Sequence, residues 1–292
     1  MCPTYKKTEA ITHVDIVCDS YPPQNNLLEL IGPRVEIKYN FTMCFCPIFG
    51  KISKENFIEY LEINSMFGAD HFIVYNTSFT PKHLSPIMHG YQDIGLMTIY
   101  QWNAYPSQSF AYHGQATALN DCLYRSKFHS RYMVNTDLDE FIVPMKQNSW
   151  KEVLEEVDRE KLAGSYSFRN LFMVQEKPKR GQDTPNGIDH INTLSKFVPR
   201  PPIMEHKTRS KFICVPQKTT VAVIHYVWEM IPGATTKVMA VNSGLLFHYN
   251  TYVPHQQGSE KQEAFNSSVN PYRMKDFRKA IIKRITEVHD RY

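Results

Sequence analysis

Three carboxylates stand close together in the segment Asp137-Leu138-Asp139-Glu140. An apolar, strand-forming run ends directly before this segment, and another begins after it. A cluster of negative charge is costly to hold together unless a positive partner binds it, and a divalent metal is the usual partner. Hard oxygen ligands suit Mg²⁺ or Mn²⁺, and these ions suit a phosphate-bearing substrate. The segment therefore predicts the metal site of an enzyme that handles a nucleotide-diphosphate sugar.

The spacing Asp-x-Asp also occurs by chance, and the simpler interpretation is that Asp137 and Asp139 cap a solvated turn. Their placement favours the metal site. The preceding run is short and strand-forming, and a helical stretch comes before it. This order puts the carboxylates at the carboxyl end of a predicted parallel strand, which is the edge where open α/β sheets bind ligands.

The elements that must position this cluster alternate along the first half of the chain. Strand-forming runs bounded by Pro, Gly and Asn alternate with runs that carry apolar residues at helical spacing. The predicted strands are Tyr39–Cys46, His71–Tyr75, Gly95–Trp102 and Arg131–Thr136, and the clearest helices are 53–68 and 113–129. Strand–helix–strand repetition with short connections predicts a doubly wound, mostly parallel α/β sheet.

The second half of the chain is less regular. The predicted elements are a helix near Trp150–Leu162, strands at Ser165–Val174, Lys211–Val215, Thr219–Val227 and Val238–Tyr249, and a helix with a basic face over Tyr272–Val288. We divide the chain into an irregular N-terminal extension (1–35), a main domain (36–258) and a C-terminal helical tail (259–292). Within the main domain we expect a nucleotide-sugar half (36–145) and an irregular acceptor-side half (146–258).

The composition argues against some partners. The 33 basic and 29 acidic residues leave a formal charge of +4, which is too small to indicate nucleic acid. No run of 18 apolar residues occurs, and the first residues lack the apolar core of a secretory signal. Glycosylation sequons at Asn40, Asn76 and Asn266, together with six cysteines, nevertheless suggest a lumenal domain whose membrane anchor lies outside this chain.

Longer segments around the cluster resemble glycosyltransferase family 92. The segments that carry the resemblance are Gln115–Arg125 and Met133–Phe141, with further agreement at Cys46–Gly50, Phe67–Asn76, Lys211–Pro216 with His225, and Leu246–Tyr249. Together they extend over residues 40–250, and the combination is far more specific than any single motif.

This resemblance implies a GT-A fold and a metal-dependent, inverting transfer from a UDP-sugar whose expected sugar is galactose. The implied acceptor is a glycan on a glycoprotein or glycolipid, and the implied location is the Golgi lumen or its membrane. One residue departs from the family pattern, because Asn250 follows His248-Tyr249 where the family usually has Arg. Asn supplies no positive charge, so a contact to phosphate or acceptor would be weaker here.

For the metal, Mn²⁺ or Mg²⁺, Asp139 is the predicted direct ligand, and Asp137 is expected to contact metal-bound water or the donor ribose. The ion would neutralise charge that develops on the departing UDP. Analogy with the implied fold suggests a histidine as a further protein ligand. His248 is the first candidate and His225 the second, and either could instead be a hydrogen-bonded core histidine.

Other residues are candidates for nucleotide-sugar binding. Asn76 ends the second strand, where the implied fold contacts the base or ribose. Gln115 begins the helix before the acidic cluster, where its amide and the helix N-terminus could meet a phosphate. Lys211 belongs with Lys207 and Arg209 to a small basic group that could hold the diphosphate or could simply be an exposed loop.

Two further features are expected to be structural. Asp121 lies two turns into the helix that Gln115 begins, and its spacing predicts an ion pair with Arg125. Cys44 and Cys46 lie two residues apart in a predicted strand and are poor candidates for pairing with each other.

An inverting transfer needs a carboxylate that deprotonates the acceptor hydroxyl as it attacks. Glu205 is the predicted catalytic base, chosen over Glu176, Asp183 and Glu229 because of its depth in the fold. Glu140 is expected either to orient the two aspartates or to contact the sugar, and a purely structural role is the alternative.

Two other functions fit parts of the pattern. A haloacid-dehalogenase-type phosphatase also uses Asp-x-Asp at a strand end, but it needs Thr where this chain has Phe141. A catalytically decayed transferase that only binds glycans is the stronger alternative. The intact acidic cluster argues against it, and Asn250 argues for it.

Overall fold

The computed structural model describes residues 13–14, 28–29, 36–102, 114–175, 191–195, 197–250 and 269–292. The chain divides into two compact units, Met1–Glu36 and Ile37–Tyr292. In the first unit, β1 (His13–Val14) pairs antiparallel with β2 (Leu28–Glu29). The second unit contains every residue that the sequence assigns to the site.

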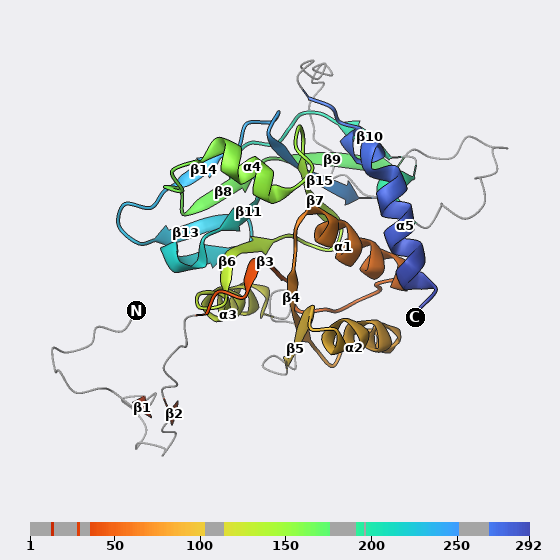
Figure 1. Ribbon diagram of the computed structural model, residues 1–292, viewed down its shortest axis with the longest axis horizontal. Coiled ribbons are helices and arrows are strands. Elements are labelled where there is room, and N and C mark those ends of the chain that lie inside the picture. Colours follow the sequence, from red (N-terminus) through yellow and green to blue (C-terminus); the bar gives the residue numbers. More distant parts are fainter. Residues whose placement is uncertain are drawn as a thin grey trace. The chain divides into compact units, whose positions relative to one another are not determined.

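Seven strands form the central sheet of the second unit, in the order β14-β8-β11-β6-β3-β4-β5 (Figure 1). Their bounds are β3 (Tyr39–Cys44), β4 (His71–Asn76), β5 (Met97–Gln101), β6 (Ser130–Asn135), β8 (Ser165–Phe168), β11 (Lys211–Cys214) and β14 (Thr236–Val238). Strand β11 runs antiparallel to both of its neighbours, and the other pairs are parallel. The mixed α/β class with a mostly parallel sheet is therefore confirmed.

Helices cover both faces of this sheet. Ser53 begins α1 (Lys54–Phe67) because its side chain accepts the Asn56 N–H at 3.1 Å, and Gly68 ends the helix with φ 128°, a conformation that favours glycine. Met43 of β3 packs in the same cluster as α1, whereas the next residue, Cys44, packs with α3 (Gln115–Ser126). Successive strand residues point to opposite faces, so α1 and α3 lie on opposite sides of β3 (Figure 1).

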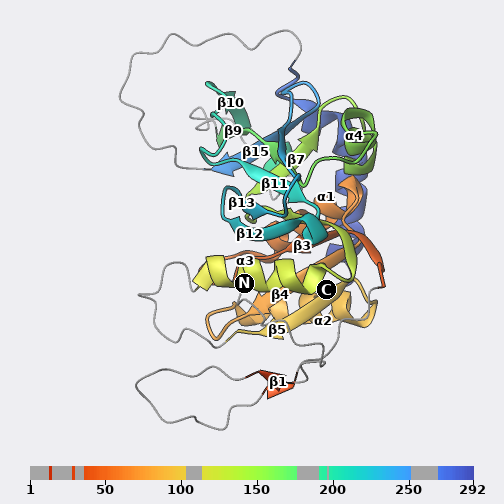
Figure 2. The same ribbon diagram turned by 90° about the vertical axis from the view of Figure 1, so that its left-hand side faces the viewer.

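A second sheet has four strands in the order β10-β9-β15-β7. Figure 2 shows it at one end of this unit, with β4 and β5 at the other end. Its strands are β7 (Glu140–Pro144), β9 (Asn170–Gln175), β10 (Phe197–Arg200) and β15 (Gly244–Asn250). Within the described residues, the chain passes from the central to the second sheet three times, from β6 to β7, from β8 to β9 and from β14 to β15. The acidic segment is the first of these three connections.

The remaining elements support the two sheets. Strands β12 (Thr219–Val223) and β13 (Tyr226–Met230) form an antiparallel hairpin, and β12 packs on α3. Helix α5 (Arg278–His289) packs along α1, where Arg284 Nη1 lies 3.0 Å from Glu62 Oε2. The others are α2 (Ser85–Asp93), α4 (Trp150–Val157) and the 3₁₀ turns Lys82–Leu84, Asn192–Leu194, Pro216–Lys218 and Arg273–Phe277. In the described part of the chain, no helix is both long enough and apolar enough to cross a membrane.

Four predicted elements are wrong in their extent. The predicted strand Thr219–Val227 is not one strand, because the chain turns at 224–225 between β12 and β13. The predicted strand Ser165–Val174 is divided at Arg169 into β8 and β9, which belong to different sheets. The predicted strand Val238–Tyr249 is likewise divided into β14 and β15. The predicted helix Trp150–Leu162 ends five residues early, because the Asp158 carboxylate accepts two of the following backbone N–H groups. Local periodicity shows that a run is extended or helical, but not which sheet it joins.

Candidate active site at the junction of the two sheets

The acidic segment forms a tight turn between β6 and β7. The Glu140 N–H donates to the Asp137 carbonyl at 3.0 Å, and the Asp137 N–H donates to Glu140 Oε2 at 3.1 Å. Thr136, just before the turn, is hydrogen-bonded through its hydroxyl to the buried Tyr60 hydroxyl at 2.6 Å. Because the turn lies where the sheets meet, side chains from β11 of one sheet and β15 of the other can both reach it.

Lys211 reaches the turn from β11. It is fully buried, and its strand pairs with β6 through Phe212 and Asn135. Its Nζ lies 2.8 Å from Asp137 Oδ2 and 3.4 Å from Glu140 Oε2. The structure therefore places the buried Lys211 in ion pairs with the acidic cluster rather than in an exposed basic loop.

The close charges shift the pKa of each partner. Burial would lower the pKa of Lys211, but Glu140 and Asp137 outweigh burial and raise it above its ordinary value. Burial opposes ionisation of Asp137, yet Lys211 holds the pKa of that carboxyl below its ordinary value. For Glu140, burial and the neighbouring aspartates prevail and raise its pKa to about 7. The cluster thus contains one carboxylate that stays ionised and one that titrates near neutral pH.

His248 reaches the turn from β15, where it is directly opposite Glu140. Its Nε2 lies 3.2 Å from Asp139 Oδ2, and its Nδ1 lies 3.3 Å from Glu140 Oε1. Burial would lower the pKa of His248, but the bond to Asp139 and the charge of Glu140 raise it. Asn170 Nδ2 also approaches Nδ1, at 3.2 Å. His248 is nearly buried, whereas the Asp139 side chain is 48% exposed, so this pair faces solvent from one side only.

Asp139 and His248 present a carboxylate oxygen and an imidazole nitrogen 3.2 Å apart. These are donor types that a divalent ion such as Mn²⁺ could use, so the two residues are the ones that would hold it. A carboxylate behind a ligating histidine is the usual arrangement that leaves the other ring nitrogen for the metal, and Glu140 occupies that place. Among the described residues no three His, Cys, Asp or Glu side chains form a ready metal site. The protein would thus supply two ligands, leaving positions for phosphate and water, as Mg²⁺-type ions prefer.

Both oxygens of Asp137 are engaged by protein groups. Besides the bond from Lys211, Gln115 Nε2 donates to Asp137 Oδ1 at 3.2 Å, and the Cys46 thiol lies 3.4 Å from the same oxygen. Gln115 is the first residue of α3, so the helix start lies at the acidic cluster, as predicted from its position. Cys46 was not predicted as a site residue. Its position just beyond the carboxyl end of β3 could have predicted it, because neighbouring parallel strands end at the same edge of the sheet as the acidic turn.

The other predicted residues lie around this centre. Asn76 ends β4, two strands from β6, and its amide donates to Gln101 at 3.2 Å. His225 lies in the β12–β13 turn, and its carbonyl accepts the Ser210 hydroxyl at 2.7 Å. Burial, and then Lys211, lower the pKa of His225. Of the two candidate histidines, the described contacts join His248 to Asp139.

Glu205 lies in an exposed turn that precedes β11, so the depth in the fold for which it was chosen is wrong. The neighbouring Met204 N–H donates to the Asn170 carbonyl at 2.8 Å, which ties this turn to the residue whose side chain contacts His248. The two rivals Glu176 and Asp183 lie outside the described residues. The predicted basic group is separated, because Lys207 lies over the Tyr226 ring at 4.8 Å while Lys211 is in the core.

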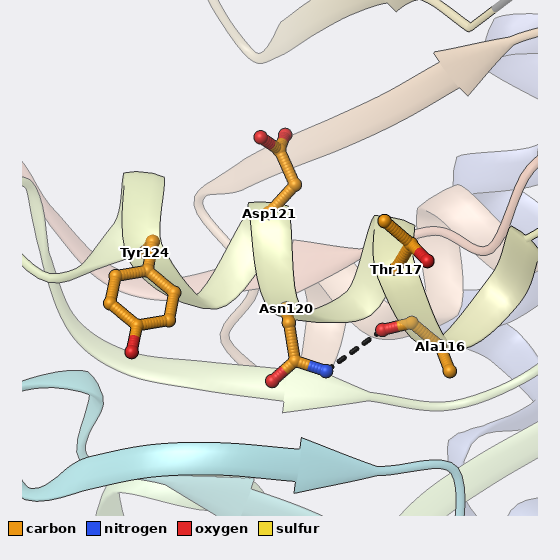
Figure 3. Close-up of a pocket in the computed structure, with 5 residues that line it drawn as sticks. All are labelled: Ala116, Thr117, Asn120, Asp121 and Tyr124. Atoms are coloured by element: carbon orange, nitrogen blue, oxygen red, sulfur yellow. Dashed lines mark hydrogen bonds between the residues drawn. The ribbon is translucent and has the colours of Figure 1, made fainter. Parts of the chain in front are cut away.

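A surface depression lies along α3, away from the acidic turn. Its lining residues are Ala116, Thr117, Asn120, Asp121 and Tyr124, all from one helix (Figure 3). The Asn120 side chain has a structural task here, because it donates to the Ala222 carbonyl at 2.8 Å and accepts the Ala222 N–H at 3.0 Å. The depression is therefore a feature of the helix surface rather than the centre of the acidic site.

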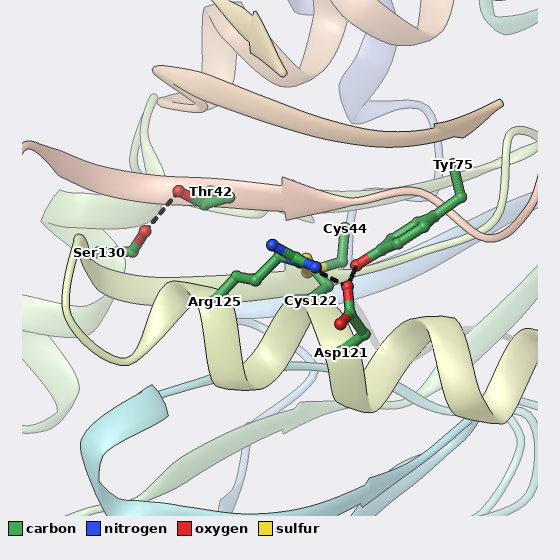
Figure 4. The surroundings of a disulfide bond; sticks show 7 residues. All are labelled: Thr42, Cys44, Tyr75, Asp121, Cys122, Arg125 and Ser130. Carbon is green, nitrogen blue, oxygen red and sulfur yellow. Dashed lines mark hydrogen bonds and ion pairs between the residues drawn. A yellow bond between two sulfur atoms is a disulfide. The ribbon is translucent and has the colours of Figure 1, made fainter. Parts of the chain in front are cut away.

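A second polar network lies beside the same helix (Figure 4). Cys44 of β3 forms a disulfide with Cys122 of α3, while Cys46 remains a thiol. Asp121 Oδ2 accepts bonds from the Tyr75 hydroxyl and from Arg125 Nε, each at 2.6 Å. The predicted ion pair between Asp121 and Arg125 is thereby confirmed.

Comparison with known proteins gives a consistent result. The model of a family described as "Glycosyltransferase family 92" matches residues 39–291. The galactan beta-1,4-galactosyltransferase GALS3 of Arabidopsis thaliana is 25% identical over 201 residues, which cover 67% of this chain and 36% of the relative. The glycosyltransferase family 92 protein F13G3.3 of Caenorhabditis elegans is 25% identical over 236 residues, covering 73% and 42%. The chain thus spans less than half the length of either relative.

Among solved structures, GalNAc-T7 with UDP, GalNAc and Mn²⁺ is similar at a TM-score of 0.40 and 11% identity. The match covers 85% of this chain and 48% of that one. At this score the likeness adds nothing to the argument from the site.

Proposed function

Because this chain belongs to glycosyltransferase family 92, we propose that it transfers a sugar from a UDP-sugar to a hydroxyl of a glycan on a glycoprotein or glycolipid. The names of its relatives support galactose as that sugar, and hence UDP-galactose as the donor. The observation that carries the proposal is the pair of Asp139 and His248, held 3.2 Å apart at the junction of two sheets. The disulfide between Cys44 and Cys122 supports an oxidising compartment such as the Golgi lumen.

In this proposal Asp139 and His248 hold Mn²⁺ or Mg²⁺. The bound ion supplies Lewis-acid neutralisation of the charge on the donor diphosphate. Glu140 Oε1 lies 3.3 Å from His248 Nδ1, so this carboxylate would orient the ring with Nε2 toward the ion and act as a positioning residue. Lys211 acts through Asp137, because its ammonium neutralises that carboxylate and fixes its orientation within the turn. These groups keep the cluster assembled before the donor arrives.

The donor would lie along the edge at which β3, β4 and β6 end. In this proposal Gln115, at the start of α3, and Asp137, which it contacts, would bind the ribose or a phosphate. Asn76 at the end of β4 is the proposed contact to the base or ribose. This arrangement would leave the Asp139 side of the turn for the diphosphate and the sugar.

Inversion at the anomeric carbon requires a base on the acceptor side. We keep Glu205 in that role, since its turn is bonded through Met204 and Asn170 toward His248. Glu205→Gln should abolish transfer and leave UDP binding unchanged. Glu229→Gln is the matched comparison, and loss of transfer in that variant alone would move the base to the β12–β13 hairpin.

The decisive experiment measures UDP release from a panel of UDP-sugars with Mn²⁺, with and without mixed glycan acceptors. Release should depend on acceptor, disappear with EDTA and fall at least ~100-fold in Asp139→Asn, the scale expected when transition-state charge loses its support. Asp276→Asn is the control. The Asp276 side chain is 49% exposed, like that of Asp139, and it pairs with Arg273 within the 3₁₀ turn Arg273–Phe277, outside the acidic turn. A folded protein that releases no UDP from any donor would contradict the proposal and favour a decayed, glycan-binding relative.

A further inference from the structure

Two aromatic side chains on β13 lie together, with Trp228 exposed to solvent and Tyr226 partly buried. The rings of Tyr226 and Trp228 are stacked, with centroids 6.0 Å apart and planes 27° from parallel, and Trp228 is 67% exposed. Val227 between them is buried. The hairpin therefore places its apolar residue in the core and presents its two largest rings outward, an arrangement that marks a binding surface when such rings gather.

The hairpin that carries these rings is fixed to the acidic site. Asn135, the last residue of β6, donates from Nδ2 to the Ile224 carbonyl at 2.9 Å. Ser210, directly before Lys211, donates to the His225 carbonyl at 2.7 Å. Ser210 is adjacent to Lys211, and Asn135 lies two residues before Asp137, so both anchors are close in sequence to the acidic cluster. Tyr226 follows this anchored turn, so the aromatic surface starts beside the proposed site of transfer.

The chemistry of this surface selects its ligand. Lys207 lies over one ring, with Nζ 4.8 Å from the Tyr226 centroid, and the exposed Glu229 follows Trp228. One cation and one anion leave the rim without excess charge, which suits a neutral ligand better than an acidic polymer. A pyranose ring has an apolar C–H face that can cover an aromatic ring and hydroxyls that can bond to a polar rim. A chain of neutral hexoses matches both properties.

We propose that Tyr226 and Trp228 form a platform that binds the acceptor glycan and delivers its reacting end to the Asp139–His248 site. This inference rests on the proposed function, because it names the subsite for the second substrate of the same reaction. It goes further in assigning acceptor recognition to a hairpin that contributes no side chain to the donor site.

Direct binding tests the platform without any catalytic readout. Isothermal titration of the whole chain would use two probes: β-1,4-linked galacto-oligosaccharides and a pool of neutral N-glycans. Trp228→Ala should weaken binding of at least one probe tenfold or more, and Trp228→Phe should restore most of it, because a ring remains. Tyr272→Ala is the control, since Tyr272 is a 40% exposed ring outside the hairpin. Thermal unfolding of each variant verifies that it is folded.

The outcomes separate the platform from the proposed function. Glycan binding that depends on Trp228 supports the platform even if no donor is ever turned over, whereas stabilisation by UDP with Mn²⁺ reports on the donor site alone. Equal glycan binding by the parent and Trp228→Ala, or no binding of either probe, would overturn the platform. Binding to phosphatidylcholine vesicles that depends on Trp228, without glycan binding, would overturn it as well and assign the rings to a membrane surface.

Discussion

The acidic turn and the Asp121 network use the same ingredients beside the same helix, with different results. Each combines a carboxylate with a cation and with neutral polar groups. The neutral group is a tyrosine hydroxyl beside Asp121, and an amide and a thiol beside Asp137. Around Asp121, the Tyr75 hydroxyl and Arg125 converge on one oxygen, and Arg125 also lies over the Tyr100 ring at 3.9 Å. The polar groups of this network therefore bond mainly to one another. That network ties α3 to the sheet.

The acidic turn differs because it has more carboxylates than its buried cation can neutralise. Lys211 is committed to Asp137 and Glu140, and Asp139 is left with His248 at a half-exposed position. Carboxylates that exceed the available positive charge and face solvent, as at Asp139, can bind a cationic ligand. A carboxylate already paired with a cation, as Asp121 is with Arg125, has no such excess charge. The difference between the two networks thus lies in charge balance and exposure rather than in residue type.

The largest expected effect in this comparison is that of Lys211→Met. Removing the buried Lys211 leaves the buried Glu140 and the partly exposed Asp137 without their cation. Because solvent screens Asp137, the free energy of unfolding should fall by an amount near the lower end of about 3–5 kcal/mol. Urea unfolding measures the loss. The double variant Lys211→Met/Asp137→Asn should regain part of it. A single variant that loses under 1 kcal/mol would show that the pair is solvated rather than buried.

Removing the disulfide beside the Asp121 network should cause the next largest loss of stability. It closes a loop with a sequence separation of 78 residues, and removing such a bond typically costs about 2–5 kcal/mol. We expect that loss for Cys44→Ala/Cys122→Ala in thermal or urea unfolding. Cys46→Ala is the matched control for a cysteine at the same strand, although it also removes a contact to Asp137. Equal stability of the double variant and the parent would contradict a stabilising disulfide between Cys44 and Cys122.

The acidic turn should also make stability depend on pH. Because the pKa of Glu140 is raised from 4.5 to about 7 in the folded protein, the folded state holds a proton that the unfolded chain releases earlier. Stability contributed by this group is therefore present below about pH 4.5 and is lost as the pH rises to about 7, on the order of 3 kcal/mol in all. Unfolding in EDTA at several pH values, compared between the parent and Glu140→Gln, measures it. An unchanged slope in the variant would exclude Glu140 as its source.

The smallest expected effect is that of Arg125→Met. The Arg125 and Asp121 side chains are 43% and 31% exposed, and partly exposed pairs of this kind contribute about 0–1 kcal/mol. Unfolding should shift by no more than that, and UDP binding with Mn²⁺ should be unchanged. A loss of several kcal/mol would mean that this network resembles the acidic turn more closely than its exposure indicates.

Much of this site was predictable from local sequence. Ser53, Gly68 and the apolar spacing of 115–126 determine the helices of the first half, and the runs before Cys46, Asn76 and Asp137 determine strands that end at one edge. Parallel pairing then places the acidic segment and Gln115 together, because such strands deliver their carboxyl ends to the same side. These predictions depend on the spacing of apolar residues within each segment and on the common direction of parallel strands, which is why the structure agrees with them.

The sequence by itself determined the acidic segment, its strand-end position and the family. Only the tertiary structure decided the partners. The buried pairing of Lys211 with Asp137, the facing of His248 and Asp139, and the bond between Cys44 and Cys122 join residues between 74 and 109 positions apart. No local pattern carries such information, because register and sheet membership follow from packing of the whole chain. The crossing from β14 to β15, which places β15 between β9 and β7 and His248 opposite Glu140, is the step that completes the site.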